Sequence, residues 1–206
     1  MSLRARTRPK IAVSQRSSRG LLERYVFFPI VSCAISMLIP FAPLTRAQSQ
    51  TEEYRVKAAL LFHFAQLVDW PPSAFASDTS AITLCTIGQD PFNGELETTL
   101  DGKSIGSRPV RISHLKDLHD AAGCHMLFVG SNETKRVPSV LMELGKAPVM
   151  TVGESDGFLE QGGMIRLDVE EGKIRFAINL DASEQAGLKV SSRMLLLAKT
   201  VVGKHK

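Results

Sequence analysis

Two short, unbroken apolar runs dominate the hydrophobic pattern of the chain, and each ends in a glycine. They are Ile82–Gly88 and Cys124–Gly130. A run of this length without polar alternation is typical of a strand that is buried on both faces of a sheet. Such strands belong to parallel sheets that helices cover on both sides. The pattern therefore predicts an α/β domain in which these two runs are central strands.

The segments around these runs complete a prediction of alternating strands and helices. Further strands are expected at 108–113 and 149–153, and helices at 54–70, 91–100, 115–121, 134–144, 182–186 and 193–202. Apolar and polar residues alternate on both sides of Glu170-Glu171-Gly172, which predicts a β-hairpin over 164–179. Together these elements predict a three-layer α/β sandwich: a Rossmann-like, mostly parallel sheet with a C-terminal β-hairpin and helix.

The first 47 residues have a different composition from the rest. Seven Lys and Arg residues precede the apolar run Tyr25–Leu44, and Thr45 and Ala47 occupy positions −3 and −1 of a cleavage site. This is the pattern of a secretory signal peptide, so we expect residues 1–47 to be removed and residues 48–206 to form a single periplasmic domain. Two alternatives remain open: an uncleaved membrane anchor, and a lipoprotein cleavage box that ends at Cys33.

The signal peptide accounts for most of the positive charge of the chain. Residues 48–206 contain 17 basic and 20 acidic side chains, which gives a net charge of −3. A nucleic-acid-binding domain needs a basic patch. The composition of the expected mature chain therefore gives no support to a nucleic-acid partner.

Two cysteines, Cys85 and Cys124, remain in the mature chain, in an oxidising compartment. The topology favours a disulfide, because the first and third strands of a doubly wound sheet are neighbours. One difficulty is geometric. If Gly88 and Gly130 lie level, the cysteines are offset by about 10 Å along the strands, whereas a disulfide needs Cα atoms within about 7 Å. Either the register shifts, or Cys124 lies in a loop before its strand.

The predicted helix 54–70 breaks the amphipathic pattern at two positions. Lys57 falls within its apolar face, and Phe62 falls among its polar residues. Lys57 is interpreted as an ion-paired or snorkelling side chain, or as a contact to a partner. Phe62 and Trp70 either pack against a neighbouring helix or serve as aromatic anchors of a protein interface. We take Lys57, Phe62 and Trp70 as the candidate partner-binding residues.

No motif of a known catalytic site is present, and we expect neither an enzyme nor a cofactor. His114, His119 and His125 lie near Cys124, but their spacing does not place ligands on one helical face, so no metal site is expected. Open α/β sheets bind ligands at the carboxyl ends of their strands. The alternative function is therefore a small-ligand-binding module with its cleft near Gly88–Phe92 and Gly130–Asn132.

A series of short motifs runs in a fixed order through residues 54–202. The motifs are Val56-Lys57-Ala58-Ala59, Trp70-Pro71, Leu84-Cys85-Thr86-Ile87-Gly88, Asp90-Pro91-Phe92, Cys124-His125-Met126-Leu127-Phe128-Val129, Val149-Met150-Thr151-Val152, Gly162-Gly163-Met164-Ile165, Arg175-Phe176-Ala177-Ile178-Asn179 and Leu195-Leu196-Leu197-Ala198. In this order they resemble the YfiR family of periplasmic regulators. The resemblance covers nearly all of the expected mature chain.

The resemblance implies an α/β sandwich without catalytic activity and a bridge between Cys85 and Cys124. It also implies that the chain represses an inner-membrane signalling protein, a diguanylate cyclase or a sensor kinase, by binding its periplasmic domain. Repression of a cyclase lowers cyclic di-GMP and biofilm formation, and an outer-membrane lipoprotein is a possible second partner. We expect the chain to be a homodimer. A second cysteine pair found in the best-known member is missing near Gly162-Gly163, so redox control by a second bridge does not carry over.

Overall fold

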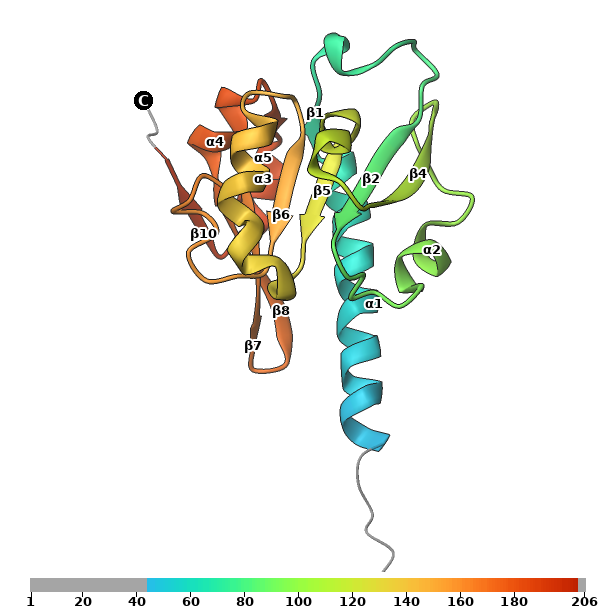
Figure 1. The fold of residues 1–206 in the computed structure, drawn as a ribbon, viewed down its shortest axis with the longest axis vertical. Helices are drawn as coiled ribbons and strands as arrows, with labels where there is room; N and C mark the ends of the chain where they lie inside the picture. Colours follow the sequence, from blue (N-terminus) through green and yellow to red (C-terminus); the bar gives the residue numbers. More distant parts are fainter. Residues whose placement is uncertain (1–43, 204–206) are drawn as a thin grey trace, which may run out of the picture. The chain divides into compact units, whose positions relative to one another are not determined.

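The computed structural model describes residues 44–203, which form an α/β domain around a mixed sheet (Figure 1). In this part of the chain, eight strands form one sheet in the order β10-β8-β7-β6-β5-β2-β4-β3, and β1 and β9 form a separate pair. The neighbours from β4 to β7 are all parallel, whereas β7 and β8 form an antiparallel hairpin. The predicted signal peptide lies outside the described residues, except that Leu44–Ala47 begin the first helix.

The strands are β1 (Val68–Asp69), β2 (Ile82–Ile87), β3 (Ser104–Ile105), β4 (Arg108–Leu115), β5 (Met126–Val129), β6 (Met150–Gly153), β7 (Ile165–Glu170), β8 (Lys173–Asn179), β9 (Lys189–Val190) and β10 (Thr200–Val202). The α-helices are α1 (Leu44–Gln66), α2 (Glu95–Leu100), α3 (Val137–Leu144), α4 (Leu180–Gln185) and α5 (Ser192–Leu197). Short 3₁₀ helices are η1 (Pro72–Ala74), η2 (Leu118–Gly123) and η3 (Ser131–Arg136).

Each face of the sheet has its own apolar core, because successive strand residues point to opposite faces. Leu84 of β2 and Phe128 of β5 pack in the core that contains α1 and α2. Cys85 and Leu127, one residue along, pack in the core that contains α3. Figure 1 shows α1 and α3 on opposite sides of the sheet. Because both faces are covered, the central strands have no polar side, and the predicted three-layer α/β sandwich is confirmed.

Two predicted helices end earlier than expected, because nearby strand edges pair with their last residues. The helix predicted to reach Trp70 ends at Gln66, and Val68 and Asp69 pair instead with β9. The helix predicted for 193–202 ends at Leu197, and Thr200–Val202 form β10 beside β8. All three positions of β10 are β-branched, so they favour the strand. Pairing with strands distant in sequence overrides helical periodicity in both places.

The helix predicted to start at Pro91 begins four residues later, at Glu95. The Asp90 side chain accepts a hydrogen bond from the backbone N–H of Phe92 (3.0 Å), which forms a turn instead of a helix cap. Asn93 and Gly94 then adopt positive φ angles of 50° and 86°. The result is an exposed loop directly after the central strand β2.

The disulfide between Cys85 and Cys124 is present, with a Cα–Cα distance of 6.0 Å. Ile87 pairs with Val129, so the glycines that follow are level, as the geometric difficulty assumed. Cys124 lies in the loop that ends η2, before β5 begins at Met126. The register is therefore not shifted, and the alternative in which Cys124 lies in a loop before its strand is the one found. The chain turns before it enters β5, and this turn brings Cys124 back beside Cys85.

Candidate functional site

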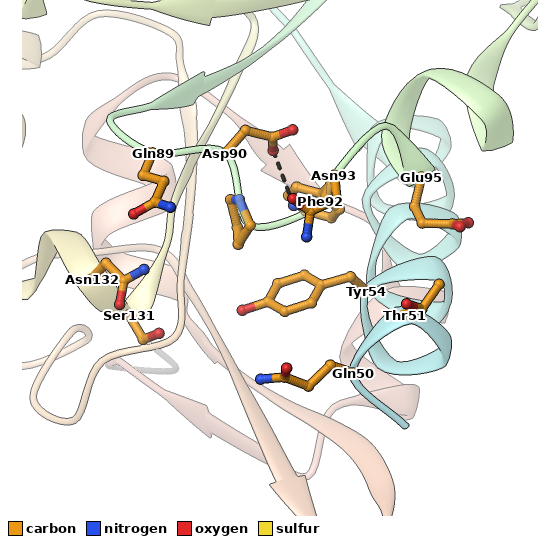
Figure 2. Close-up of a pocket in the computed structure, with 11 residues that line it drawn as sticks. Gln50, Thr51, Tyr54, Gln89, Asp90, Phe92, Asn93, Glu95, Ser131 and Asn132 are labelled. Carbon is orange, nitrogen blue, oxygen red and sulfur yellow. Dashed lines mark hydrogen bonds between the residues drawn. The ribbon is translucent and has the colours of Figure 1, made fainter. Parts of the chain in front are cut away.

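A cleft of about 420 Å³ opens at the carboxyl ends of β2 and β5 (Figure 2). The loop after β2 supplies Gln89–Asn93 to its wall, and the first turn of η3, directly after β5, supplies Ser131 and Asn132. The first turns of α1 supply the remaining side, with Gln50, Thr51 and Tyr54. In a sheet of this order, β2 and β5 flank the point where the direction of winding reverses, which is where open α/β sheets bind ligands. The cleft lies where the sequence predicted a small-ligand site.

Glycine is required at the start of the first of these loops. Gly88 has a φ angle of 81°, and an added Cβ would lie 2.0 Å from Oε1 of Glu133. The Glu133 carboxylate is itself paired with Arg136 at 3.1 Å. The backbone after β2 and the helical turn after β5 therefore approach each other closely at the base of the cleft.

A buried charge cluster attaches α1 to the sheet beside the cleft. The ammonium group of Lys57 is paired with the carboxylates of Glu53, on α1, and Glu154, directly after β6. The Tyr54 hydroxyl donates to Oε2 of Glu154 (3.2 Å), and the backbone N–H of Ser131 donates to the same oxygen (3.2 Å). The side chains of Lys57 and Glu154 are 4% and 5% exposed. Buried charges persist only when they are paired and hydrogen-bonded, and this cluster satisfies both conditions.

The environment of Tyr54 keeps its hydroxyl protonated. Burial raises the pKa of Tyr54 well above its usual value, and the negative charge of Glu154 raises this pKa further. The ring lies edge-on to Phe92, with centroids 5.3 Å apart, and the Lys57 ammonium lies 4.4 Å from its centroid. Tyr54 therefore links the wall of the cleft to the charge cluster. Figure 2 shows its side chain extending from α1 toward Ser131 and Asn132.

The structure separates the three predicted partner-binding residues. Lys57 is 3% exposed and is ion-paired within the domain, as in the interpretation of Lys57 as an ion-paired side chain. Phe62 is half-buried, with the Lys103 ammonium 5.0 Å from its ring centroid. Trp70 is half-buried at the other end of the sheet, where its indole N–H donates to the carbonyl of His125 (3.2 Å). The three residues do not form one surface patch.

An exposed apolar surface that the sequence did not predict lies beside α1, on the side of β8. We call it the α1–hairpin–α5 surface: its grooves are lined by Val56 and the partly buried Leu60 of α1, by Val169 and the partly buried Ile174 of the hairpin, and by Leu197 of α5, next to which Leu196 is exposed. Leu196 and Leu197 are 85% and 67% exposed. Grooves of about 420 Å³ and 390 Å³ separate α1 from the hairpin and from α5. The run Leu195-Leu196-Leu197 in a short helix was the sequence signal for this surface.

The histidines serve structural roles in the part of the chain that the structure describes. No group of three or more His, Cys, Asp or Glu residues there can hold a metal ion. His114 bridges Thr86 Oγ1 (2.7 Å) and Glu97 Oε1 (2.6 Å), an order that resembles a hydroxyl–imidazole–carboxylate triad. Thr86 is 1% exposed in a central strand, so its hydroxyl cannot reach a substrate.

The histidine beside the disulfide is held by the backbone on both ring nitrogens. His125 Nδ1 accepts from the backbone N–H of Thr83 (3.1 Å), so the proton lies on Nε2, which donates to the carbonyl of Ala74 (3.1 Å). The ring stacks on Phe75, with centroids 4.6 Å apart. Burial lowers the pKa of His125, and the positive charge of Arg108 lowers this pKa further.

Comparison with solved structures relates the chain to α/β domains. A conserved domain protein from Vibrio cholerae O1 biovar El Tor aligns with a TM-score of 0.50 and 11% identity, over 72% of this chain and 60% of that one. At this identity the likeness shows the fold alone, and the chain spans about 60% of the length of that protein. The ABC domain in complex with L-Trp from Streptococcus pneumoniae aligns with a TM-score of 0.44 and 10% identity, over 58% of this chain and 55% of that one.

Comparison at the level of sequence gives a family. No curated protein matches the chain significantly. Among residues 44–203, no helix has the length and apolar character needed to cross a membrane. The family model described as YfiR/HmsC-like matches residues 54–199, from the Tyr54 side of the cleft to the residue before β10. The resemblance read from the ordered motifs is therefore confirmed, and the chain belongs to the YfiR/HmsC-like family.

Proposed function

We propose that this chain is a non-catalytic periplasmic regulator that binds and represses an inner-membrane diguanylate cyclase, and thereby lowers cyclic di-GMP and biofilm formation. The family match over residues 54–199 carries the proposal, because it suggests a periplasmic regulator of cyclic di-GMP signalling. A sensor kinase is the other class of inner-membrane partner under this proposal. An outer-membrane lipoprotein that sequesters the regulator, and a homodimeric state, belong to the same proposal.

The α1–hairpin–α5 surface supports a binding role. Isolated exposed apolar residues are common, but a contiguous group in two grooves beside one helix is typical of an interaction site. Val56, Leu196 and Leu197 are exposed on neighbouring elements of this surface. We propose that it contacts the periplasmic domain of the cyclase, with Phe62 and Trp70 as further candidate contacts outside it.

The absence of an assembled catalytic group in the described residues is consistent with a regulator. The one triad-like arrangement noted above, His114 with Thr86 and Glu97, has its hydroxyl inside a covered sheet. The buried charges at Lys57 and Glu154 are used to attach α1. These groups therefore have structural work that requires no substrate.

The proposal is tested by co-purification of the full-length chain with solubilised inner membranes, followed by identification of the captured protein. Wild type is expected to recover a membrane protein that carries a diguanylate cyclase domain. The double variant Leu196→Asp/Leu197→Asp is expected to lose at least 90% of it, because burying a carboxylate at an apolar contact is strongly unfavourable. Met142→Asp is the matched control, since Met142 is 80% exposed on α3, at the opposite face.

Three results would count against this proposal. Recovery of no signalling protein by wild type argues against the regulator itself. Equal loss with Met142→Asp shows that the surface is not specific. If the double variant keeps its cyclase but changes from dimer to monomer by light scattering, the surface joins two copies of this chain instead.

A second candidate function is a small-ligand-binding module that feeds an envelope receptor. The cleft at the carboxyl ends of β2 and β5 favours it, because its position and its volume of about 420 Å³ are those of small-molecule sites. A thermal-shift screen of periplasmic metabolites tests this candidate. At least one stabilising compound is expected, and a screen without any would argue for a purely protein-binding regulator.

A further inference from the structure

We propose that the cleft at the carboxyl ends of β2 and β5 binds a saccharide that is neutral or carries an amino group. The proposal rests on the second candidate function, and it is independent of the identity of any protein partner. Three features of the cleft carry it: the charge of the lining, the kind of hydrogen-bonding groups there, and the ring beside them.

The charge of the lining disfavours anionic ligands. Among the described residues that line the cleft there is no Lys, Arg or His, whereas Asp90 and Glu95 contribute two carboxylates. Glu133, which lies outside the lining and close to Gly88, is paired with Arg136. Phosphates, sugar acids and free amino acids are bound most strongly where a cationic side chain meets their anionic end, and the described lining of the cleft has none. Nucleotides and carboxylic acids therefore meet repulsion here, whereas a neutral or protonated amino ligand does not.

The hydrogen-bonding groups match a ligand with many hydroxyls. Four amide side chains line the cleft: Gln50, Gln89, Asn93 and Asn132. Each amide offers donors and an acceptor at one planar end, and a sugar hydroxyl likewise both donates and accepts. The amides come from α1, from the loop after β2 and from η3 after β5, and Figure 2 shows them around the Tyr54 side chain. A ring with several hydroxyls can engage all three segments at once, which a small amine cannot.

The cleft also has an apolar wall. Tyr54 and Pro91 form this wall, and the edge-on contact of Tyr54 with the buried Phe92 holds the tyrosine ring in place. The negative face of an aromatic ring attracts C–H groups of positive partial charge, which a pyranose presents on its apolar side. The Tyr54 hydroxyl is already bonded to Glu154, so we assign the ring rather than the hydroxyl to the ligand.

The cleft residues Gln89, in the loop after β2, and Asn132, in η3, are both exposed, so their replacement by alanine leaves the core intact. The matched control is Gln161→Ala, because Gln161 is an exposed amide outside the cleft.

The test is isothermal titration calorimetry on the purified full-length chain. The probes are glucose, galactose, mannose, N-acetylglucosamine, glucosamine and the disaccharides of these sugars, with glucose 6-phosphate and glucuronate as anionic analogues. At least one neutral or amino sugar is expected to bind, and its anionic analogue is expected to bind at least tenfold more weakly. Gln89→Ala/Asn132→Ala is expected to weaken binding at least tenfold, whereas Gln161→Ala retains it.

Three outcomes would overturn the proposal. The first is that no saccharide of the panel binds, and the second is that the anionic analogue binds as well as the neutral sugar. The third is that a sugar binds equally to wild type and to Gln89→Ala/Asn132→Ala, which would locate it elsewhere. None of these outcomes alters the expected capture of a cyclase, so failure of this inference is distinguishable from failure of the regulator proposal.

Discussion

The two ends of the parallel strands are built from different chemistry. At the amino end of β5, the disulfide, His125, Phe75 and Trp70 pack together, and both nitrogens of His125 bond to the backbone. At the carboxyl end, amide side chains line an open cleft above the cluster of Lys57 and Glu154. At the amino end the polar groups bond to the protein itself, whereas at the carboxyl end the amide side chains are available to a ligand.

This difference indicates where stability and recognition are located. The covalent bond and the histidine hold loops at the amino end, whereas at the carboxyl end α1 is held by the charge cluster and by the contact of Tyr54 with Phe92. A buried ion pair is a weak source of net stability, because desolvation of both charges offsets their attraction. Lys57 is therefore best understood as a residue that sets the position of α1 beside the cleft.

The largest expected effect comes from the amino end, by removal of the disulfide. The double variant Cys85→Ala/Cys124→Ala is expected to lose about 4 kcal/mol of unfolding free energy, because the unfolded chain is released from a closed loop. The separation of 39 residues between the cysteines makes that loop long. Urea denaturation monitored by circular dichroism measures the loss.

Hydrogen exchange on the same variant tests whether the effect is local to the amino end. The amides of Thr83 and Cys124, which bond to the side chain of His125 and the carbonyl of Ala121, should lose most protection. The amide of Ser131, at the carboxyl end, should lose less. Equal loss of protection at both ends would contradict the comparison.

The next effect comes from the carboxyl end. Lys57→Met keeps much of the side-chain volume but leaves the carboxylate of Glu154 buried without its cation, and is expected to cost about 3 kcal/mol. Arg55→Met is the control, since the Arg55–Glu52 pair on the same helix is more than half exposed, and it should cost under about 1 kcal/mol. Denaturation in urea measures both, and similar small losses would show that the cluster does not attach α1.

The smallest expected effect is the pH dependence of the unfolding free energy that His125 contributes, because it comes from the titration of a single side chain. Its pKa is lowered by burial in the folded state, so the stability it contributes is present above about pH 6.5 and is lost as the pH falls below that value. His119 has the opposite sign. It is exposed and hydrogen-bonded to Glu143, which raises its pKa, so its contribution is present below about pH 6.5 and is lost as the pH rises.

Unfolding free energies from pH 5 to 8 separate the two histidines. The unfolding free energy of His119→Gln should lie below that of wild type under about pH 6.5 and approach it as the pH rises, because the contribution of His119 is present only at the lower pH. The variant His125→Gln should show a flatter acid limb than wild type. If the unfolding free energy of His125→Gln falls below pH 6.5 as steeply as that of wild type, then neutral His125 does not stabilise the amino end.

Local sequence pattern was sufficient for the core of the fold and insufficient at its edges. Unbroken apolar runs predicted β2 and β5, and alternation around Gly172 predicted the hairpin. The pairs β1–β9 and β8–β10 were missed, because strands of two or three residues form only where a distant edge accepts them. No local pattern carries that information.

The candidate site was predicted only in part, for a similar reason. The topological rule predicted a cleft at the loops after β2 and β5, and the structure has one there. It did not predict that Gln50, Thr51 and Tyr54 of α1 complete the wall. The position of α1 depends on the ion pair between Lys57 and Glu154, which are 97 positions apart. Nothing in the local sequence around either residue predicts this pair.

Cellular cyclic di-GMP reports most directly on the proposed restraint of a cyclase across the inner membrane. It is measured in a strain that lacks residues 48–206, beside wild type and a strain in which they are restored. We expect a several-fold rise on deletion and a return to the wild-type level on restoration. An unchanged level in all three strains would contradict the regulator proposal and would favour a ligand-binding subunit of another envelope receptor.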